Sequence, residues 1–105
     1  MNKKLRLASR RCVEATSDAE HIGVVDDFDV YETERGLVFV KTVLGWDPID
    51  KKALREEFED AITSWYIDRE WPIDVPVRCD VVAFRVINEE RAIIKYIFNA
   101  VEKDE

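Results

Sequence analysis

Acidic residues are densest in the segment 26–34, where grouped carboxylates could hold a metal ion. Alternate residues of a β-strand point to the same face, so Asp27 and Asp29 would lie side by side if this segment is extended. Oxygen ligands suit magnesium or manganese, and magnesium needs only one or two protein carboxylates when a substrate phosphate supplies other ligands. The same charges could equally protect a solvated hairpin edge. The carboxylates are Asp26, Asp27, Asp29, Glu32 and Glu34.

Other catalytic arrangements have no support in the local sequence. His21 is the only histidine and has no cysteine close to it, so neither a Ser/His/Asp nor a Cys/His site is expected. The sequence contains no GxSxG, GxxxxGKS/T or GxGxxG motif, which removes the usual devices of acyl transfer and nucleotide binding. Cys12 and Cys79 lie far apart without metal-ligand spacing, and we interpret them as buried thiols.

Length and composition predict one folded domain over residues 1–105. The chain is 47% hydrophobic and 37% charged, outside the range in which chains stay unfolded. Its net charge is −7, yet the first eleven residues carry five cations and no acid, which leaves 11 basic and 23 acidic residues, or −12, in the remainder. This remainder is acidic enough to repel phosphate, so only the basic residues 1–11 are candidates for binding nucleic acid. These cations are Lys3, Lys4, Arg6, Arg10 and Arg11.

No stretch approaches the length of about 18 apolar residues that a membrane span needs. The basic start is followed by no apolar signal-peptide region. We therefore expect a cytoplasmic protein with no membrane partner.

The hydrophobic pattern predicts an α/β domain in which one long helix packs on a mixed sheet. Asp47 is expected to cap this helix and Pro48 to occupy its first turn, because an apolar stripe with helical spacing follows them. Trp46 and Trp71 flank the helix and are candidate partner contacts. The expected order is a strand or basic arm at the N-terminus (strand 5–13), a loop (14–20), a hairpin (28–33 and 37–44), the helix (47–69), a strand (77–87) and a last strand (92–98).

Several short segments, in this order, resemble the YraN family of small bacterial proteins, which have a restriction-endonuclease-like fold. Members show a GEIDLIA-like strand, LVFVEVKTR, a helix, RFDVVAV and a NAF-like end. The matching stretches here are DFDVY at 27–31, LVFVKTV at 37–43, the helix from Asp47, RCDVVAF at 78–84 and IFNAV at 97–101. Residues 5–12 correspond weakly to the first strand of the family.

The resemblance implies a degenerate nuclease site. In such nucleases an Asp and the Glu of an ExK motif hold a divalent metal, and the Lys assists the attacking water. Asp29 matches the Asp, but a gapless alignment puts Lys41 at the Glu and Val43 at the Lys. A two-residue deletion instead matches Lys41 and Thr42 to the Lys and Thr and leaves the Glu missing. We therefore expect Asp29 to pair with Lys41 rather than with a metal.

The ends of the matching region also differ from the family. The helix that normally precedes the first strand is expected to be absent, and residues 15–25 are expected to form an insertion before the acidic strand. Both changes would affect the surroundings of the nuclease site.

These observations predict a non-catalytic, nuclease-like domain with no cofactor, which binds nucleic acid or a protein of nucleic-acid processing. An alternative is an endonuclease that uses magnesium or manganese at a rearranged site of Asp27, Asp29, Glu32 and Lys41. A second alternative is a structural module that forms a homodimer through a sheet edge or the Trp46 region.

Overall fold

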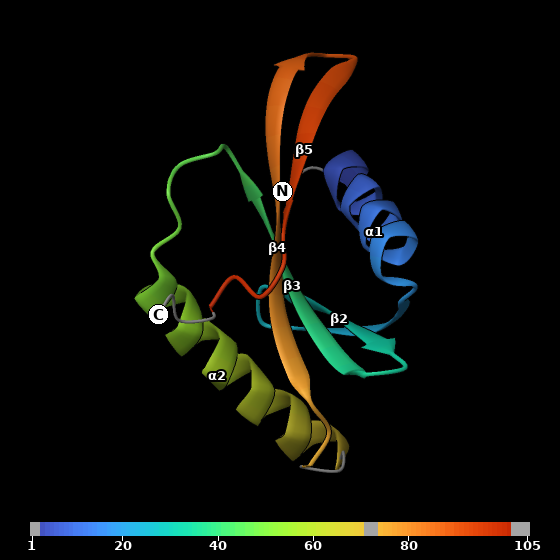
Figure 1. Ribbon diagram of the computed structural model, residues 1–105, viewed down its shortest axis with the longest axis vertical. Helices are drawn as coiled ribbons and strands as arrows, with labels where there is room; N and C mark the ends of the chain where they lie inside the picture. Colours follow the sequence, from blue (N-terminus) through green and yellow to red (C-terminus); the bar gives the residue numbers. More distant parts are fainter. Residues whose placement is uncertain (1–2, 71–73, 102–105) are drawn as a thin grey trace.

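The computed structural model describes residues 3–70 and 74–101, in which a five-stranded sheet lies between two helices (Figure 1). The strand order is β1-β2-β3-β4-β5, and all neighbours are antiparallel except β3 and β4, which are parallel. The predicted α/β class with a mixed sheet is therefore confirmed. The elements are α1 (Lys3–Ser17), β1 (Glu20–Val25), β2 (Phe28–Thr33), β3 (Gly36–Leu44), α2 (Lys51–Arg69), β4 (Val77–Asn88) and β5 (Arg91–Ile97).

The N-terminal segment is a helix, so both the predicted strand over 5–13 and the predicted absence of a leading helix are wrong. Leu5 and Leu7 alternate like strand residues, but Leu5, Ser9 and Val13 recur at helical spacing. Ser9 and Val13 are buried against the sheet, whereas Leu7 is 48% exposed. Leucine, alanine, lysine and arginine are also good helix formers, and they dominate this segment. The basic residues at its start therefore belong to α1 and do not form an arm.

Residues 15–25, which were predicted to be an insertion, complete α1 and form the edge strand β1. Asp18 has a φ of 48° and turns the chain between the two elements, so the predicted loop over 14–20 is largely helix. Gly23 lies within the irregular part of the pairing between β1 and β2. A Cβ atom there would stand 2.9 Å from the Trp65 ring. Glycine thus allows α2 to pack closely against this strand.

The hairpin formed by β2 and β3 is confirmed, but the helix after it begins later than predicted. α2 starts at Lys51, and Asp50, not Asp47, is its N-cap. Asp50 Oδ1 accepts a hydrogen bond from the backbone N–H of Ala53 at 3.1 Å, which satisfies one free donor of the first turn. The helix ends at Arg69, where Glu70 adopts the left-handed conformation.

The last two strands agree with the predicted pattern within one or two residues. β4 is internal because it pairs with both β3 and β5, and Val81 and Phe84 are buried as predicted. α2 is the crossover between the parallel strands β3 and β4. No described helix is both long and apolar enough to cross a bilayer.

Each face of the sheet has its own hydrophobic core. On one face, α2 inserts Leu54, Phe58, Ala61 and Trp65 against β2, β3 and β4. On the other, Val13 of α1 packs on Tyr31, Val38, Val40, Val82 and Phe84. Cys79 is buried in the first core, and burial raises the pKa of its thiol to about 12. The thiol of Cys12 is half-buried rather than buried, and both cysteines are free.

Candidate functional site

Asp29 lies in the middle of a cationic cluster between α1 and the sheet. It is 4% exposed, and its Oδ1 atom is 2.9 Å from Nε2 of His21 on β1. The guanidinium groups of Arg6 and Arg10, one turn apart on α1, each approach the same oxygen to 3.8 Å. Tyr31 packs edge-on against His21 at a ring-centroid distance of 5.1 Å. The carboxylate that the resemblance assigns to a metal is thus surrounded by side chains that carry or can accept positive charge.

The predicted ion pair between Asp29 and Lys41 does not form, because the two side chains lie on opposite faces of the sheet. Asp29 pairs across the hairpin with Val40, while Lys41 pairs with Phe28, which belongs to the core under α2. Directly opposed residues share a face. Lys41 instead forms an ion pair with Glu57 of α2, with an Nζ to Oε2 distance of 2.5 Å.

The same register shows where a second metal ligand would have to stand. The β3 residues on the Asp29 face are Val40 and Thr42, not the Lys41 and Val43 of the gapless alignment. The hydroxyl of Thr42 is hydrogen-bonded to that of Ser9 at 2.7 Å. Val40 therefore occupies the position from which a carboxylate could share an ion with Asp29.

A second buried aspartate completes this row across three strands. Val40 pairs with Asp29 on one side and with Asp80 of β4 on the other. Asp80 is fully buried, and Arg78 binds it through Nε to Oδ1 and Nη2 to Oδ2, both at 2.9 Å. Tyr96 donates to Oδ2 at 2.6 Å and the backbone N–H of Asn99 to Oδ1 at 3.0 Å. Burial and the hydrogen bond to Asp80 raise the pKa of Tyr96 to about 12.

The other predicted ligands lie apart from Asp29. Asp27 is an exposed residue of the turn between β1 and β2, so it is not beside Asp29 on a strand face as predicted. Glu32 is an exposed residue of β2. Among residues 3–70 and 74–101 no three His, Cys, Asp or Glu side chains are grouped as a metal site would require.

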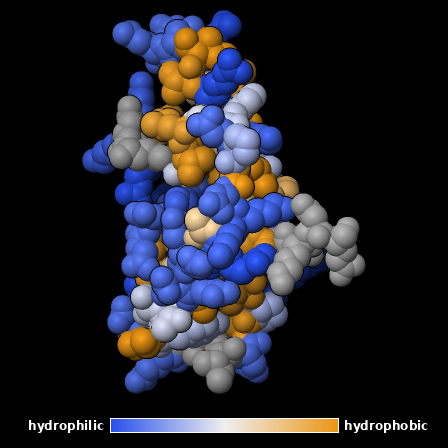
Figure 2. Space-filling model, turned by 90° about the vertical axis from the view of Figure 1, so that its left-hand side faces the viewer, coloured by the Kyte–Doolittle hydropathy of each residue, from blue (hydrophilic) through white to orange (hydrophobic). Residues whose placement is uncertain are grey.

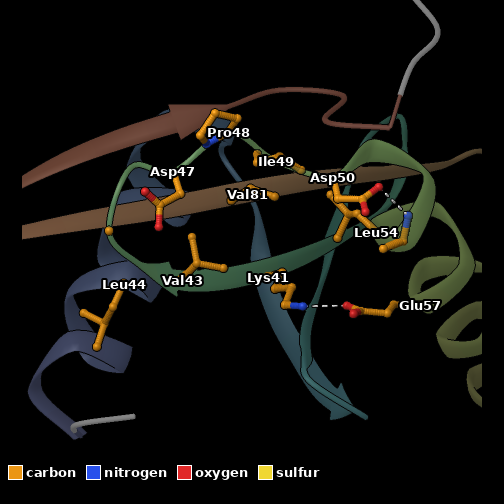
Figure 3. Close-up of a pocket in the computed structure, with 12 residues that line it drawn as sticks. Lys41, Val43, Leu44, Asp47, Pro48, Ile49, Asp50, Leu54, Glu57 and Val81 are labelled. Carbon is orange, nitrogen blue, oxygen red and sulfur yellow. Dashed lines mark hydrogen bonds and ion pairs between the residues drawn. The ribbon is translucent and has the colours of Figure 1, made fainter.

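A cleft of about 240 Å³ opens on the α2 face, between the end of β3 and the start of α2 (Figure 3). Val43, Leu54 and Val81 give it an apolar floor. Three of its charged groups are already engaged, because Lys41 binds Glu57 and Asp50 caps α2. Lys41, a vestigial candidate for catalysis, thus lines a cleft on the opposite face of the sheet from Asp29.

The five N-terminal cations are divided by the helix that carries them. Arg6 and Arg10 face Asp29, whereas Lys3 and Arg11 are exposed on α1. Lys4 is also an exposed residue of this helix. Two of the five cations that were predicted to form a basic surface, Arg6 and Arg10, are therefore directed toward Asp29.

The β4–β5 hairpin extends beyond the rest of the sheet at one end of the molecule (Figure 1). Apolar side chains gather on this upper end in Figure 2. β5 is an edge strand with β4 as its neighbour in the sheet. Trp46 is 40% exposed, and the Arg85 guanidinium lies 5.7 Å from its ring centroid, at the base of the hairpin. Trp71 lies outside the described residues. The exposed hairpin residues are Val86, Ile87, Ile93 and Ile94, at 55%, 57%, 43% and 41%.

Comparison with known proteins finds no matching family model, no matching curated protein and no matching solved structure. The relation to the YraN pattern consequently depends on the short segments quoted above.

Sequence reasoning missed His21 and Asp80. The sequence shows no partner for His21, because only the pairing of β1 with β2 brings it next to Asp29. Asp80 had a visible signal, because an aspartate in a nearly continuous apolar strand needs a partner and Arg78 stands two residues away on the same face.

Proposed function

We propose that this chain is a non-catalytic domain of the restriction-endonuclease-like class that binds another protein through its β4–β5 hairpin. The fold class is supported by the element order and by the parallel pairing of β3 with β4 across α2. The helix α1 also supports it, because the YraN pattern has a helix before its first strand. These features strengthen the resemblance in the segments around Asp29 and Asp80.

The loss of catalysis is supported by the row Asp29, Val40, Asp80. Each carboxylate in this row is bound by its own basic side chains, and the residue between them is an apolar valine. A hydrolytic metal ion must be held in a defined geometry with open positions for water and substrate. A metal ion at Asp29 would first have to displace His21, Arg6 and Arg10, and the loss of these contacts would weaken its binding.

The observation that carries the binding function is the exposed apolar hairpin, in which β5 pairs with β4 but with no other described strand, so that its second edge is free of them. Its four branched aliphatic residues lie on two paired strands, Ile93 on the α2 side and Val86 and Ile94 on the α1 side, and they are 41–57% exposed. Clustered apolar exposure of this kind marks interaction surfaces, and an open edge can accept another strand. Nucleic acid fits these aliphatic residues less well, since isoleucine and valine do not bind phosphate.

The non-catalytic part predicts no metal-dependent cleavage. Purified protein incubated with duplex DNA or RNA and magnesium or manganese should release no more product than its Asp29→Ala variant. Gel analysis of end-labelled substrates measures this. Cleavage that requires metal and disappears in Asp29→Ala would contradict the proposal and favour the endonuclease alternative.

The binding part predicts a partner whose retention depends on the hairpin. Immobilised protein and an Ile87→Ser/Ile93→Ser variant are compared for the proteins they retain from a lysate of the source organism. A protein held by the unmodified chain should be lost with the double variant. Ile67→Ser, which changes an isoleucine 73% exposed on α2, should retain it. Identical sets of proteins on all three would contradict a binding role for the hairpin.

A further inference from the structure

The charge on the β4–β5 hairpin is opposite in sign to that of the chain as a whole. The strand segments 85–88 and 91–97 contain three cations and no acid, in a chain with a net charge of −7. Between residues 85 and 97 the only acids, Glu89 and Glu90, lie in the turn of the hairpin. The cations are Arg85, Arg91 and Lys95.

The three cations share one face of the hairpin with an exposed isoleucine. Arg91, Ile93 and Lys95 alternate along β5, and they fall on the same side as Ile97, which packs in the core under α2. Arg85 is paired with Ile93 across the two strands. The α2 side of the hairpin is therefore a surface where positive and apolar side chains alternate, next to the free edge of β5.

We propose that the free edge of β5 binds an extended segment of another protein in which acidic and apolar residues alternate. The segment would add a sixth strand, with backbone hydrogen bonds to β5 supplying affinity and alternate side chains supplying selectivity. Its acidic side chains would lie on the α2 side, against Arg91 and Lys95, and its apolar ones on the opposite side, against Ile94, which pairs with Phe84 of the core under α1. This inference depends on the protein-binding function proposed above.

The same cations disfavour a second copy of this chain as the occupant. Pairing β5 with another β5 would bring Arg91 and Lys95 of both copies onto neighbouring strands, and like charges on facing strands are destabilising. A lysine on an open edge is a known protection against self-association. An acidic strand removes that repulsion and gains attraction.

The test uses three labelled, end-capped synthetic peptides. In the glutamate peptide, glutamate alternates with valine, and in the lysine peptide lysine replaces each glutamate. The third is the glutamate peptide with N-methylated backbone amides. Fluorescence anisotropy with the full chain should show binding of the glutamate peptide alone, and added salt should weaken it. Amide hydrogen exchange should slow in β5. N-methylation should abolish binding because it blocks the strand ladder.

Charge reversal distinguishes specific pairing from general attraction. Arg91→Glu/Lys95→Glu should lower the affinity for the glutamate peptide by about tenfold, as expected for two partly exposed ion pairs. The same variant should bind the lysine peptide more tightly than the unmodified chain does. Arg35→Glu/Lys52→Glu makes the same change in net charge at exposed residues outside the hairpin and should leave affinity unchanged. Equal binding of both peptides, equal effects of both variants, binding of the N-methylated peptide, or self-association through β5 would each overturn the inference. Hairpin-dependent capture from lysate would then still stand, so this failure differs from failure of the proposed function.

Discussion

Replacing Asp80 with alanine is expected to lower the free energy of unfolding by about 3–5 kcal/mol, because it leaves a buried ion pair without its anion. Arg78, whose side chain is only 31% exposed, would lose both of its hydrogen bonds to the carboxylate. The O–H of Tyr96 and the N–H of Asn99 would lose the same acceptor. Domains of this size are usually stable by about 5–15 kcal/mol, so the variant should be close to unfolding. Urea titration followed by tryptophan fluorescence measures the loss.

A double variant separates the cost of the unpaired cation from the cost of the lost volume. Asp80→Ala/Arg78→Met should be more stable than Asp80→Ala alone, since no buried charge is then left unpaired. Asp68→Ala, at an exposed carboxylate in the last turns of α2, should change stability by less than about 0.5 kcal/mol. If Asp80→Ala unfolds at the same urea concentration as Asp68→Ala, the network around Asp80 contributes nothing to the fold.

The sequence was informative wherever one pattern dominated a segment. The hairpin of β2 and β3, the stripe of α2 and the apolar run of β4 each have a single reading, and the structure agrees. α1 was misjudged because Leu5 and Leu7 fit a strand while Leu5, Ser9 and Val13 fit a helix. Only packing against the sheet decides between them, because it buries Ser9 and Val13. β1 carries a glycine and two polar residues in six, which is a weak strand signal.

The candidate site was predicted in part, because a strand's register cannot be counted from motifs alone. The resemblance drew attention to Asp29 and predicted an ion pair with Lys41, but Lys41 lies on the other face of the sheet. A change of one residue in register moves every side chain to the other face. The true neighbours, Arg6, Arg10 and His21, come from α1 and β1. These are the two elements that the sequence did not predict.

Gly36 should be the least replaceable glycine of the chain, and Gly36→Ala is expected to cost about 2–4 kcal/mol. Gly36 begins β3 with a φ of 132°, a conformation that residues with a Cβ rarely adopt. An added Cβ would stand 2.2 Å from the carbonyl oxygen of Pro76. That carbonyl accepts a hydrogen bond from Leu37 at 2.9 Å, where β4 begins beside β3. Relieving the clash would therefore disturb the only parallel pairing among the described strands.

Gly45→Ala is the matched control, because it isolates backbone strain from the clash. Gly45 also has a positive φ, at 91°, but an added Cβ would meet no atom within 4 Å. Its substitution should cost about 1 kcal/mol from conformational strain alone. The two variants are compared by urea unfolding, and amide exchange in β3 and β4 should increase only for Gly36→Ala. Equal losses of stability would mean that Pro76 moves aside freely and that the contact does not hold β4 in register.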